Sequence, residues 1–163
     1  MKDRIGKILL SSIIVITGVL LSGCGTGKEI SALSSVSYCY TSGSMAYSNC
    51  SYSLRSVKGK YIAKVRPVGV PDEKAVEAEV DETVMREIEA VFKKYEVGQW
   101  DGFKKYNRNV MDGRSFSLSL MMKNGDSLDA SGYMEWPKNF SSVRQELDAI
   151  FMKIYRAHRP ESR

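Results

Sequence analysis

The chain has 163 residues, 43% of them hydrophobic and 26% charged, and its formal net charge is +5 at pH 7. This composition is that of a globular protein, and the positive charge is too small to indicate a nucleic-acid-binding protein. No cluster of Lys and Arg with interleaved aromatic residues occurs, so we expect no nucleic acid among the partners. With one histidine and three cysteines the sequence offers no His/Cys metal cluster, and we expect neither a metal nor a cofactor.

The N-terminal segment begins with basic residues, continues with an apolar run and ends with small residues. Lys2, Arg4 and Lys7 precede a nearly unbroken apolar run of 14 residues from 8 to 21. That length is typical of a signal peptide and is shorter than the roughly 20 residues a helix needs to cross a bilayer. We therefore predict that residues 1–23 are a signal peptide. An uncleaved membrane anchor is the alternative.

The four residues after this run, Leu21-Ser22-Gly23-Cys24, resemble the lipobox of bacterial lipoproteins. The resemblance implies that the signal is cut between Gly23 and Cys24 and that Cys24 carries a diacylglyceryl thioether and becomes the acylated first residue. Two or more acyl chains give stable anchoring. We therefore expect a lipid anchor in the cell membrane or outer membrane, with the domain outside the cytoplasm. An ordinary secretory signal with an incidental cysteine is the other reading.

Removing the first 23 of 163 residues leaves 140 residues, close to the usual size of one domain. We read residues 24–34 as a lipidated tether because they are mildly polar and have no clear period. Residues 35–156 are expected to form a single α+β domain, and 157–163 a polar tail.

Two segments rich in Tyr, Ser, Val and Thr, residues 36–41 and 47–56, predict a β-hairpin that turns at residues 43–46. If the turn is centred between Ser44 and Met45, Cys39 lies opposite Cys50. Directly opposed residues have Cβ atoms close enough for a bridge, so we predict a disulfide in this exported chain. Two free thiols are the alternative.

A second hairpin is predicted at residues 58–59, with the returning strand at 60–68. It pairs Leu54 with Ala63 and Tyr52 with Val65. Strict alternation then divides the three strands into two faces. The expected core face carries Cys39, Cys50, Tyr52, Leu54, Tyr61, Ala63 and Val65, and the expected outer face carries Tyr38, Tyr40, Asn49, Ser51, Ser53, Lys64 and Arg66.

Apolar residues at helical spacing predict a helix that begins after the N-cap Asp81 and ends near residue 96. Strict alternation predicts strands at 115–122 and 127–131, and a second apolar stripe predicts a helix from about residue 142. The order is therefore βββ-α-ββ-α. We expect an α+β fold with a five-stranded antiparallel sheet and two helices on one face.

The mature domain is similar to a group of small uncharacterised lipoproteins of anaerobic bacteria. The similarity rests on four stretches and covers most of the mature chain, and it implies no activity. The stretches are Gly43-Ser44-Met45-Ala46-Tyr47, Trp100-Asp101-Gly102-Phe103, Asp112-Gly113-Arg114-Ser115-Phe116-Ser117-Leu118 and Ala130-Ser131-Gly132-Tyr133.

Several carboxylates fall in predicted loops or strand ends, where a pair could act as acid and base or bind a cation. They are Asp101, Asp112, Asp126, Asp129 and Glu135. Their spacing matches no such motif, and the serines have no histidine or lysine placed to activate one of them. We predict no catalytic residue and read the carboxylates as turn-forming or solvated.

The expected outer face combines large tyrosines with small polar residues, a composition typical of adaptable binding surfaces. The candidate binding residues are Tyr38, Tyr40, Tyr47, Trp100 and Phe103. We expect a membrane-anchored binding or interaction module for a protein, peptide or glycan. The alternatives are an envelope hydrolase with a carboxylate-based site and a purely structural envelope protein. For the tyrosines the alternative is a sheet surface with high β-propensity and no ligand, or one covered by the loop at residues 98–114.

Overall fold

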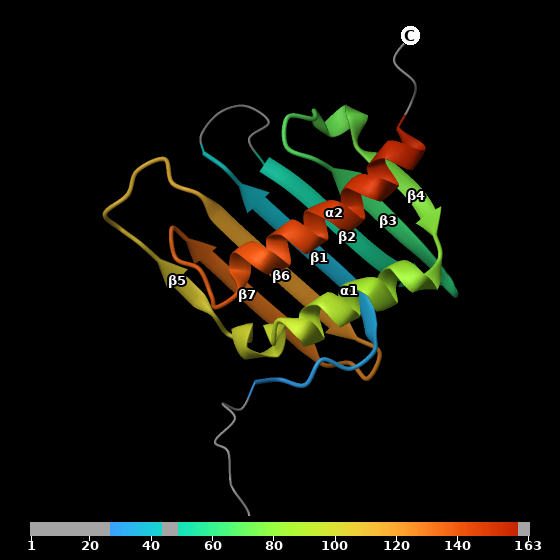
Figure 1. Cartoon of the computed structure of the whole chain (residues 1–163), viewed down its shortest axis with the longest axis horizontal. Coiled ribbons are helices and arrows are strands. Elements are labelled where there is room, and N and C mark those ends of the chain that lie inside the picture. The colour runs from blue at the N-terminus through green and yellow to red at the C-terminus, as the bar shows by residue number, and fades with distance from the viewer. Residues whose placement is uncertain (1–26, 44–48, 160–163) are drawn as a thin grey trace, which may run out of the picture.

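In the computed structural model, which describes residues 27–43 and 49–159, one sheet of seven strands runs through the domain and two long helices lie on one side of it (Figure 1). The strands are β1 (Leu33–Thr41), β2 (Asn49–Val57), β3 (Lys60–Arg66), β4 (Val76–Val80), β5 (Lys104–Tyr106), β6 (Ser115–Met122) and β7 (Ser127–Tyr133). The helices are α1 (Glu82–Lys94) and α2 (Phe140–His158), with short 3-10 turns η1 (Asp72–Lys74) and η2 (Val97–Trp100).

The strand order across the sheet is β4-β3-β2-β1-β6-β7-β5. All neighbours pair antiparallel except β5 and β7, which are parallel. The predicted α+β class is therefore confirmed, but the five-stranded antiparallel sheet is wrong because the sheet is mixed and has two more strands. Both extra strands lie at the edges of the sheet.

β4 was missed because its sequence, Val-Glu-Ala-Glu-Val, places charge on alternate residues after a proline-rich segment. It pairs with β3 as an edge strand, and its glutamates form ion pairs with the neighbouring strands: Arg55 Nη2 lies 3.7 Å from Glu77 and Lys60 Nζ 2.7 Å from Glu79. Charged edge strands resist pairing with other chains. β5 has only three residues, all exposed, and follows a loop-like stretch.

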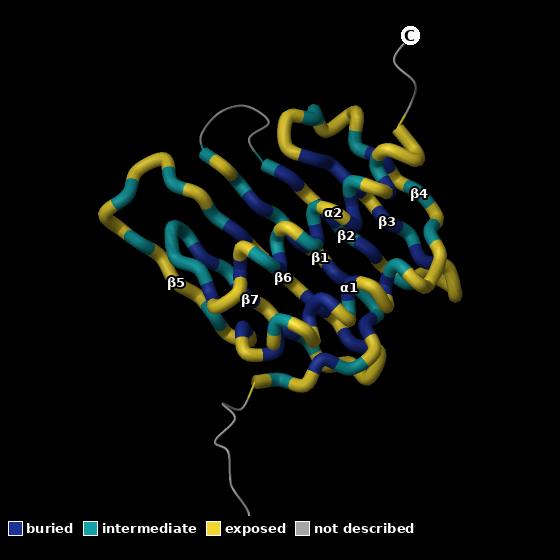
Figure 2. The backbone as a smooth tube through the Cα atoms, in the orientation of Figure 1, coloured by how far each residue is buried: buried dark blue, intermediate teal, exposed yellow. Residues whose placement is uncertain are grey.

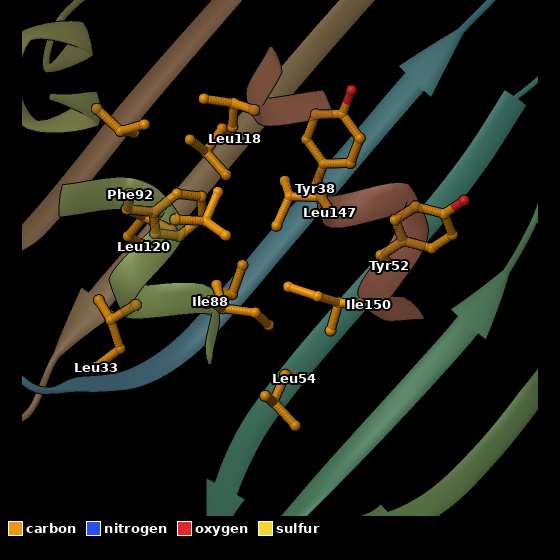
Figure 3. Close-up of a cluster of buried hydrophobic side chains, with 14 of the residues drawn as sticks. Leu33, Tyr38, Tyr52, Leu54, Ile88, Phe92, Leu118, Leu120, Leu147 and Ile150 are labelled. Carbon is orange, nitrogen blue, oxygen red and sulfur yellow. The ribbon is translucent and has the colours of Figure 1, made fainter. Parts of the chain in front are cut away.

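The core lies between the sheet and the two helices (Figure 3). α1 contributes Ile88 and Phe92, and α2 contributes Leu147, Ile150 and Phe151, at the helical spacing seen in the sequence. Asp81 caps α1 as predicted, because its side chain accepts the backbone N–H of Thr83 at 2.8 Å. The sheet contributes Leu33, Tyr38, Tyr52, Leu54, Leu118 and Leu120, all at most 2% exposed.

The pairing of β2 with β3 has the predicted register, with Leu54 opposite Ala63 and Tyr52 opposite Val65. The pairing of β1 with β2 differs from the prediction by one residue: Tyr40, and not Cys39, lies opposite Cys50. A slip of one residue moves every side chain of a strand to the other face of the sheet. The predicted faces of β1 are therefore inverted, and its tyrosines lie in the core.

The described chain joins the domain earlier than predicted. Ile30 is 6% exposed and packs in the core, Leu33 begins β1, and the backbone N–H of Lys28 donates to the carbonyl of Gly98 at 2.9 Å. Residues 27–34 are therefore part of the domain and not a tether. α2 continues to His158, two residues beyond the predicted end of the domain.

The predicted signal peptide and Cys24 lie outside the described residues. Within the part of the chain that is described, neither helix is long and apolar enough to cross a membrane.

Candidate functional site: the uncovered face of the sheet

Most of the candidate binding residues are not surface residues. Tyr38 and Tyr40 are 1% and 2% exposed and contact the helices, so their assignment to an outer face was wrong. Trp100 is 2% exposed and donates its indole N–H to the carbonyl of Lys138 at 3.1 Å. Phe103 is half-buried, with its ring 6.2 Å from that of Phe116. Tyr47 lies outside the described residues.

Cys39 and Cys50 are free thiols on opposite faces of the sheet, so the predicted disulfide is wrong. The thiol of Cys50 points into the core, where burial raises its pKa to about 11. Cys39 lies half-buried on the uncovered face. Burial raises the pKa of Cys39, and the positive charge of nearby Arg66 opposes that shift.

The face of the sheet away from the helices is covered by no described element (Figures 1 and 2). The strand pairings place nine serines on it, and we call this surface the serine face. Its serines are Ser35, Ser37, Ser51, Ser53, Ser115, Ser117, Ser119, Ser127 and Ser131.

The serines form rows that run across the strands. In one row, Ser53, Ser37 and Ser119 follow one another across β2, β1 and β6, and Asp129 of β7 continues the row. Neighbouring strands lie about 4.8 Å apart, and same-face residues along a strand about 6.7 Å apart. The serine face is therefore a regular array of hydroxyl groups, each of which can donate and accept.

Most charges on the β2–β4 side of this face form ion pairs, but exposed Lys64 of β3 has no ion-pair partner among the described residues. Besides the ion pairs of Glu77 and Glu79 with β2 and β3, the Arg66 Nε atom lies 2.7 Å from an Asp72 carboxylate oxygen. Arg66 is 7% exposed and also donates to the carbonyl of Asn49 at 2.8 Å. These pairs hold most of the charged groups on this side to each other, and Lys64 remains as an unpaired ammonium group beside the hydroxyl array.

A hollow of about 360 Å³ lies on the serine face where β7 meets the segment leading into β5. Four serines line it, and Asp129 and Lys104 place opposite charges beside them. Neither charge has an ion-pair partner among residues 27–43 and 49–159. The serines are Ser37, Ser117, Ser119 and Ser131.

Backbone hydrogen bonds fix the wall of this hollow. The N–H of Gly102 donates to the carbonyl of Asp129 at 3.0 Å, and the N–H of Ser131 donates to the carbonyl of Phe103 at 2.8 Å. The φ of Gly102 is +71°, a conformation that favours glycine at this turn. The segment that carries Lys104 is therefore held beside β7, and Lys104 lies opposite Ser131 in the parallel pairing.

An aromatic pair borders the serine face one row further along β7. The rings of Tyr106 and Tyr133 stack at 4.6 Å between centroids, and Tyr106 is 65% exposed. The Tyr133 hydroxyl accepts the N–H of Gly113 at 2.6 Å and donates to the carbonyl of Val110 at 3.1 Å. Tyr133 is thus fixed, and it supports Tyr106 as an exposed ring beside the hollow.

Of the carboxylates considered in the sequence, Asp126 serves a turn through hydrogen bonds with Asn124, and Asp112 occupies a positive-φ position at 56°. Asp101 is ion-paired with Lys28 at 3.4 Å. Only Asp129 lines the hollow. Among the described residues no group of three His, Cys, Asp or Glu side chains is arranged to hold a metal ion.

The sequence predicted Ser51 and Ser53 on this face, but the register error placed the β1 tyrosines there in place of Ser35 and Ser37. The signal was present in Ser115, Ser117 and Ser119, which alternate with buried apolar residues, and in Ser35 and Ser37 of β1. Asp129 and Lys104 carried no sequence signal, because they come together only through the parallel pairing of β5 with β7.

A comparison of the chain with protein-family models and with curated proteins found no match.

Proposed function

We propose that this protein is a lipid-anchored, extracytoplasmic binding module that holds an envelope glycan on its serine face. The anchor is the acylated Cys24, and the signal peptide and lipobox of residues 1–24 support it. The ligand site is the hollow beside β7. One observation carries the ligand proposal: an array of serine hydroxyls surrounds a carboxylate and an ammonium group that have no ion-pair partner among the described residues.

The chemistry of the hollow favours a polyhydroxylated ligand over an apolar one. Pockets for apolar ligands are lined mainly by hydrophobic side chains, whereas this one combines Phe103, Leu118 and Ala130 with four serines, Asp129 and Lys104. A carboxylate accepts charge-assisted hydrogen bonds from sugar hydroxyls, and an ammonium group pairs with an acidic substituent. The exposed ring of Tyr106 offers an amphipathic surface against which a sugar ring can pack. We therefore propose that the ligand is a glycan that carries carboxylate groups.

The test is co-sedimentation of the detergent-solubilised, acylated protein with insoluble envelope polysaccharide. The variant Asp129→Asn with Lys104→Gln removes both unpaired charges and is expected to weaken binding about tenfold or more, because hydrogen bonds to charged groups contribute about 1.5–3 kcal/mol each. The matched control, Arg55→Gln with Glu77→Gln, removes an ion pair from the other side of the same face and is expected to bind as wild type.

All four substituted side chains are exposed, so thermal unfolding is expected to stay near wild type for both variants. A chemically neutral glycan serves as a second ligand and is expected to lose less affinity than the acidic one when Lys104 is changed. Equal sedimentation of both double variants and the wild type would contradict the assignment of the ligand to this hollow.

A further inference from the structure

We infer that the domain stands upright on the membrane, so that one end of its strands rests on the lipid headgroups. This end lies at the lower right in Figure 1, and we call it the lower edge. It consists of residues 27–32, the β2–β3 turn at residues 58–59 and the β6–β7 turn at residues 123–126. The inference rests on the acylation of Cys24 in the proposed function. The new element is the surface of the domain that contacts the membrane.

The first described residues are fastened to the domain. The N–H of Lys28 donates to the carbonyl of Gly98 at 2.9 Å, and the Lys28 ammonium group contacts both the carbonyl of Ser127 and the carboxylate of Asp101. A Cβ atom at Gly98 would collide with the carbonyl oxygen of Lys28, so glycine permits this close approach. Ile30 is buried two residues later. The chain is therefore fixed to the domain from residue 28 onward.

Residues 25, 26 and 27 separate the acylated cysteine from this fixed segment. Four residue steps span at most about 14 Å, so residue 28 lies within about 14 Å of the Cα atom of Cys24. The headgroup layer on each side of a bilayer is about 5–8 Å thick. Acyl chains buried in the hydrocarbon therefore hold the surface around residue 27 against the headgroups.

The strand pairings define which other residues share this edge. Leu33 lies beside Met122, and the N–H of Lys123 donates to the carbonyl of Ala32 at 2.8 Å, so the β6–β7 turn lies next to the anchor. Ser35 lies beside Arg55, which brings the β2–β3 turn to the same end. At the far end Thr41 lies beside Ser115, about 27 Å away along β1.

The lower edge carries exposed charges of both signs. Lys58 in the β2–β3 turn and Lys93 near residue 27 have no ion-pair partner among the described residues, and neither do Glu29 and Asp126. Basic residues next to a membrane are attracted to anionic headgroups and acidic ones are repelled, so the short anchor, and not the net charge, sets the orientation. Upright standing also turns the serine face sideways, so that a glycan running along the membrane surface meets it.

The inference is tested with spin labels on the acylated full-length protein in vesicles that contain anionic and nickel-chelating lipids. Lys93→Cys places a label near the anchor, and Met111→Cys places one in the 107–114 loop at the far end, where Met111 is 91% exposed. Both variants carry Cys39→Ser, and Cys50 stays buried. We expect the nickel headgroups to enhance the relaxation of the label at position 93 several-fold more than that at position 111.

A flexible insertion of twelve Gly and Ser residues after Thr26 is the matched control. It lengthens the reach by about 20 Å on average and is expected to remove most of the difference between the two labels. Equal relaxation enhancement of the labels at positions 93 and 111 in acylated protein would overturn the upright orientation. A difference between the two labels that persists with the insertion would show that the short anchor does not set the orientation. Mass spectrometry that finds no acyl group would instead remove the anchor, and with it the proposed function.

Discussion

The rings of Tyr38 and Tyr52 both lie in the core under α2 (Figure 3). The two rings are 6.1 Å apart, and Asp148 of α2 lies near the Tyr52 hydroxyl. The Tyr38 hydroxyl is buried and has no hydrogen-bond partner among the described residues. Burial raises the pKa of both tyrosines above the ordinary value, so both stay neutral at physiological pH.

The two tyrosines therefore make a matched pair for mutation. Tyr38→Phe removes an unsatisfied hydroxyl and is expected to leave the free energy of unfolding unchanged or to raise it by up to about 1 kcal/mol. Tyr52→Phe removes a hydroxyl that lies near Asp148 and is expected to lower the free energy of unfolding by about 0.5–1.5 kcal/mol. Urea unfolding measures both. A loss above about 1 kcal/mol for Tyr38→Phe would mean that its hydroxyl has a partner.

The two thiols are expected to differ in reactivity. In the unreduced, unfolded protein both Cys39 and Cys50 should be alkylated, because no bridge joins them. In the native protein only half-exposed Cys39 should react. Its rate should rise as the pH rises through 8 and above, because burial raises its pKa and only the thiolate attacks. Two alkylation-resistant sulfurs in unfolded protein would show that a disulfide exists after all.

The pKa of Cys50 also predicts a pH dependence of stability. Its folded pKa of about 11 lies above the ordinary value of 9.0, so the unfolded state releases the proton first as the pH rises. Below about pH 9 the ionisation of Cys50 does not change the free energy of unfolding. Between about pH 9 and pH 11 the free energy of unfolding is expected to fall. Cys50→Ala should flatten this slope in urea unfolding at pH 8 to 11. The same slope in wild type and variant would assign it to other groups.

The register of β1 was predictable from its own residues. Val36, Tyr38 and Tyr40 alternate with Ser35, Ser37 and Cys39, and the larger set belongs in a core. The wrong prediction came from fixing the register by an assumed turn centre, whereas the strands pair Thr41 with Asn49. Turn chemistry fixes register only when the length of the loop is known.

At the scale of elements, each helix packs on the sheet through an apolar stripe that includes a fully buried phenylalanine. Phe92 of α1 and Phe151 of α2 are both 0% exposed, and the Phe151 ring stacks on Tyr52 at 4.8 Å. This packing covers one face of the sheet, as the apolar stripes predicted.

Phe92→Ala and Phe151→Ala are each expected to lower the free energy of unfolding by about 3–5 kcal/mol, because each leaves a cavity in the shared core. Lys93→Ala, next to Phe92 but exposed, is the control and should change it by less than about 0.5 kcal/mol. Denaturant unfolding checks all three. A loss below about 1 kcal/mol for either phenylalanine would contradict the packing of that helix on the sheet.

Long periodic elements were predictable, and short edge strands were not. α1, α2, β6 and the β2–β3 hairpin each carry a pattern over many residues, which a sequence displays directly. β4 and β5 have five and three residues and depend on pairing with β3 and β7. Such strands are fixed by tertiary contacts, so local sequence does not reveal them.

At the scale of the whole molecule, the sheet has one face covered by helices and one face rich in serine. Two amphipathic helices suffice to cover one face, so one-sided coverage was predictable from the number of helices. The hollow was not, because it requires the parallel strand β5, which holds Lys104 beside Ser131. The same arrangement places residue 27 at one end of the strands, which links the anchor to the orientation of the serine face.

Both the proposed function and the upright orientation depend on the modification of Cys24. The most direct measurement is the intact mass and N-terminal sequence of the protein isolated from membranes of cells grown with labelled palmitate. The account predicts a chain that begins at residue 24, carries acyl groups and partitions into detergent, and Cys24→Ala should lose the label and the partitioning. A chain that retains residues 1–23, or one that has an unmodified thiol at Cys24, would contradict it.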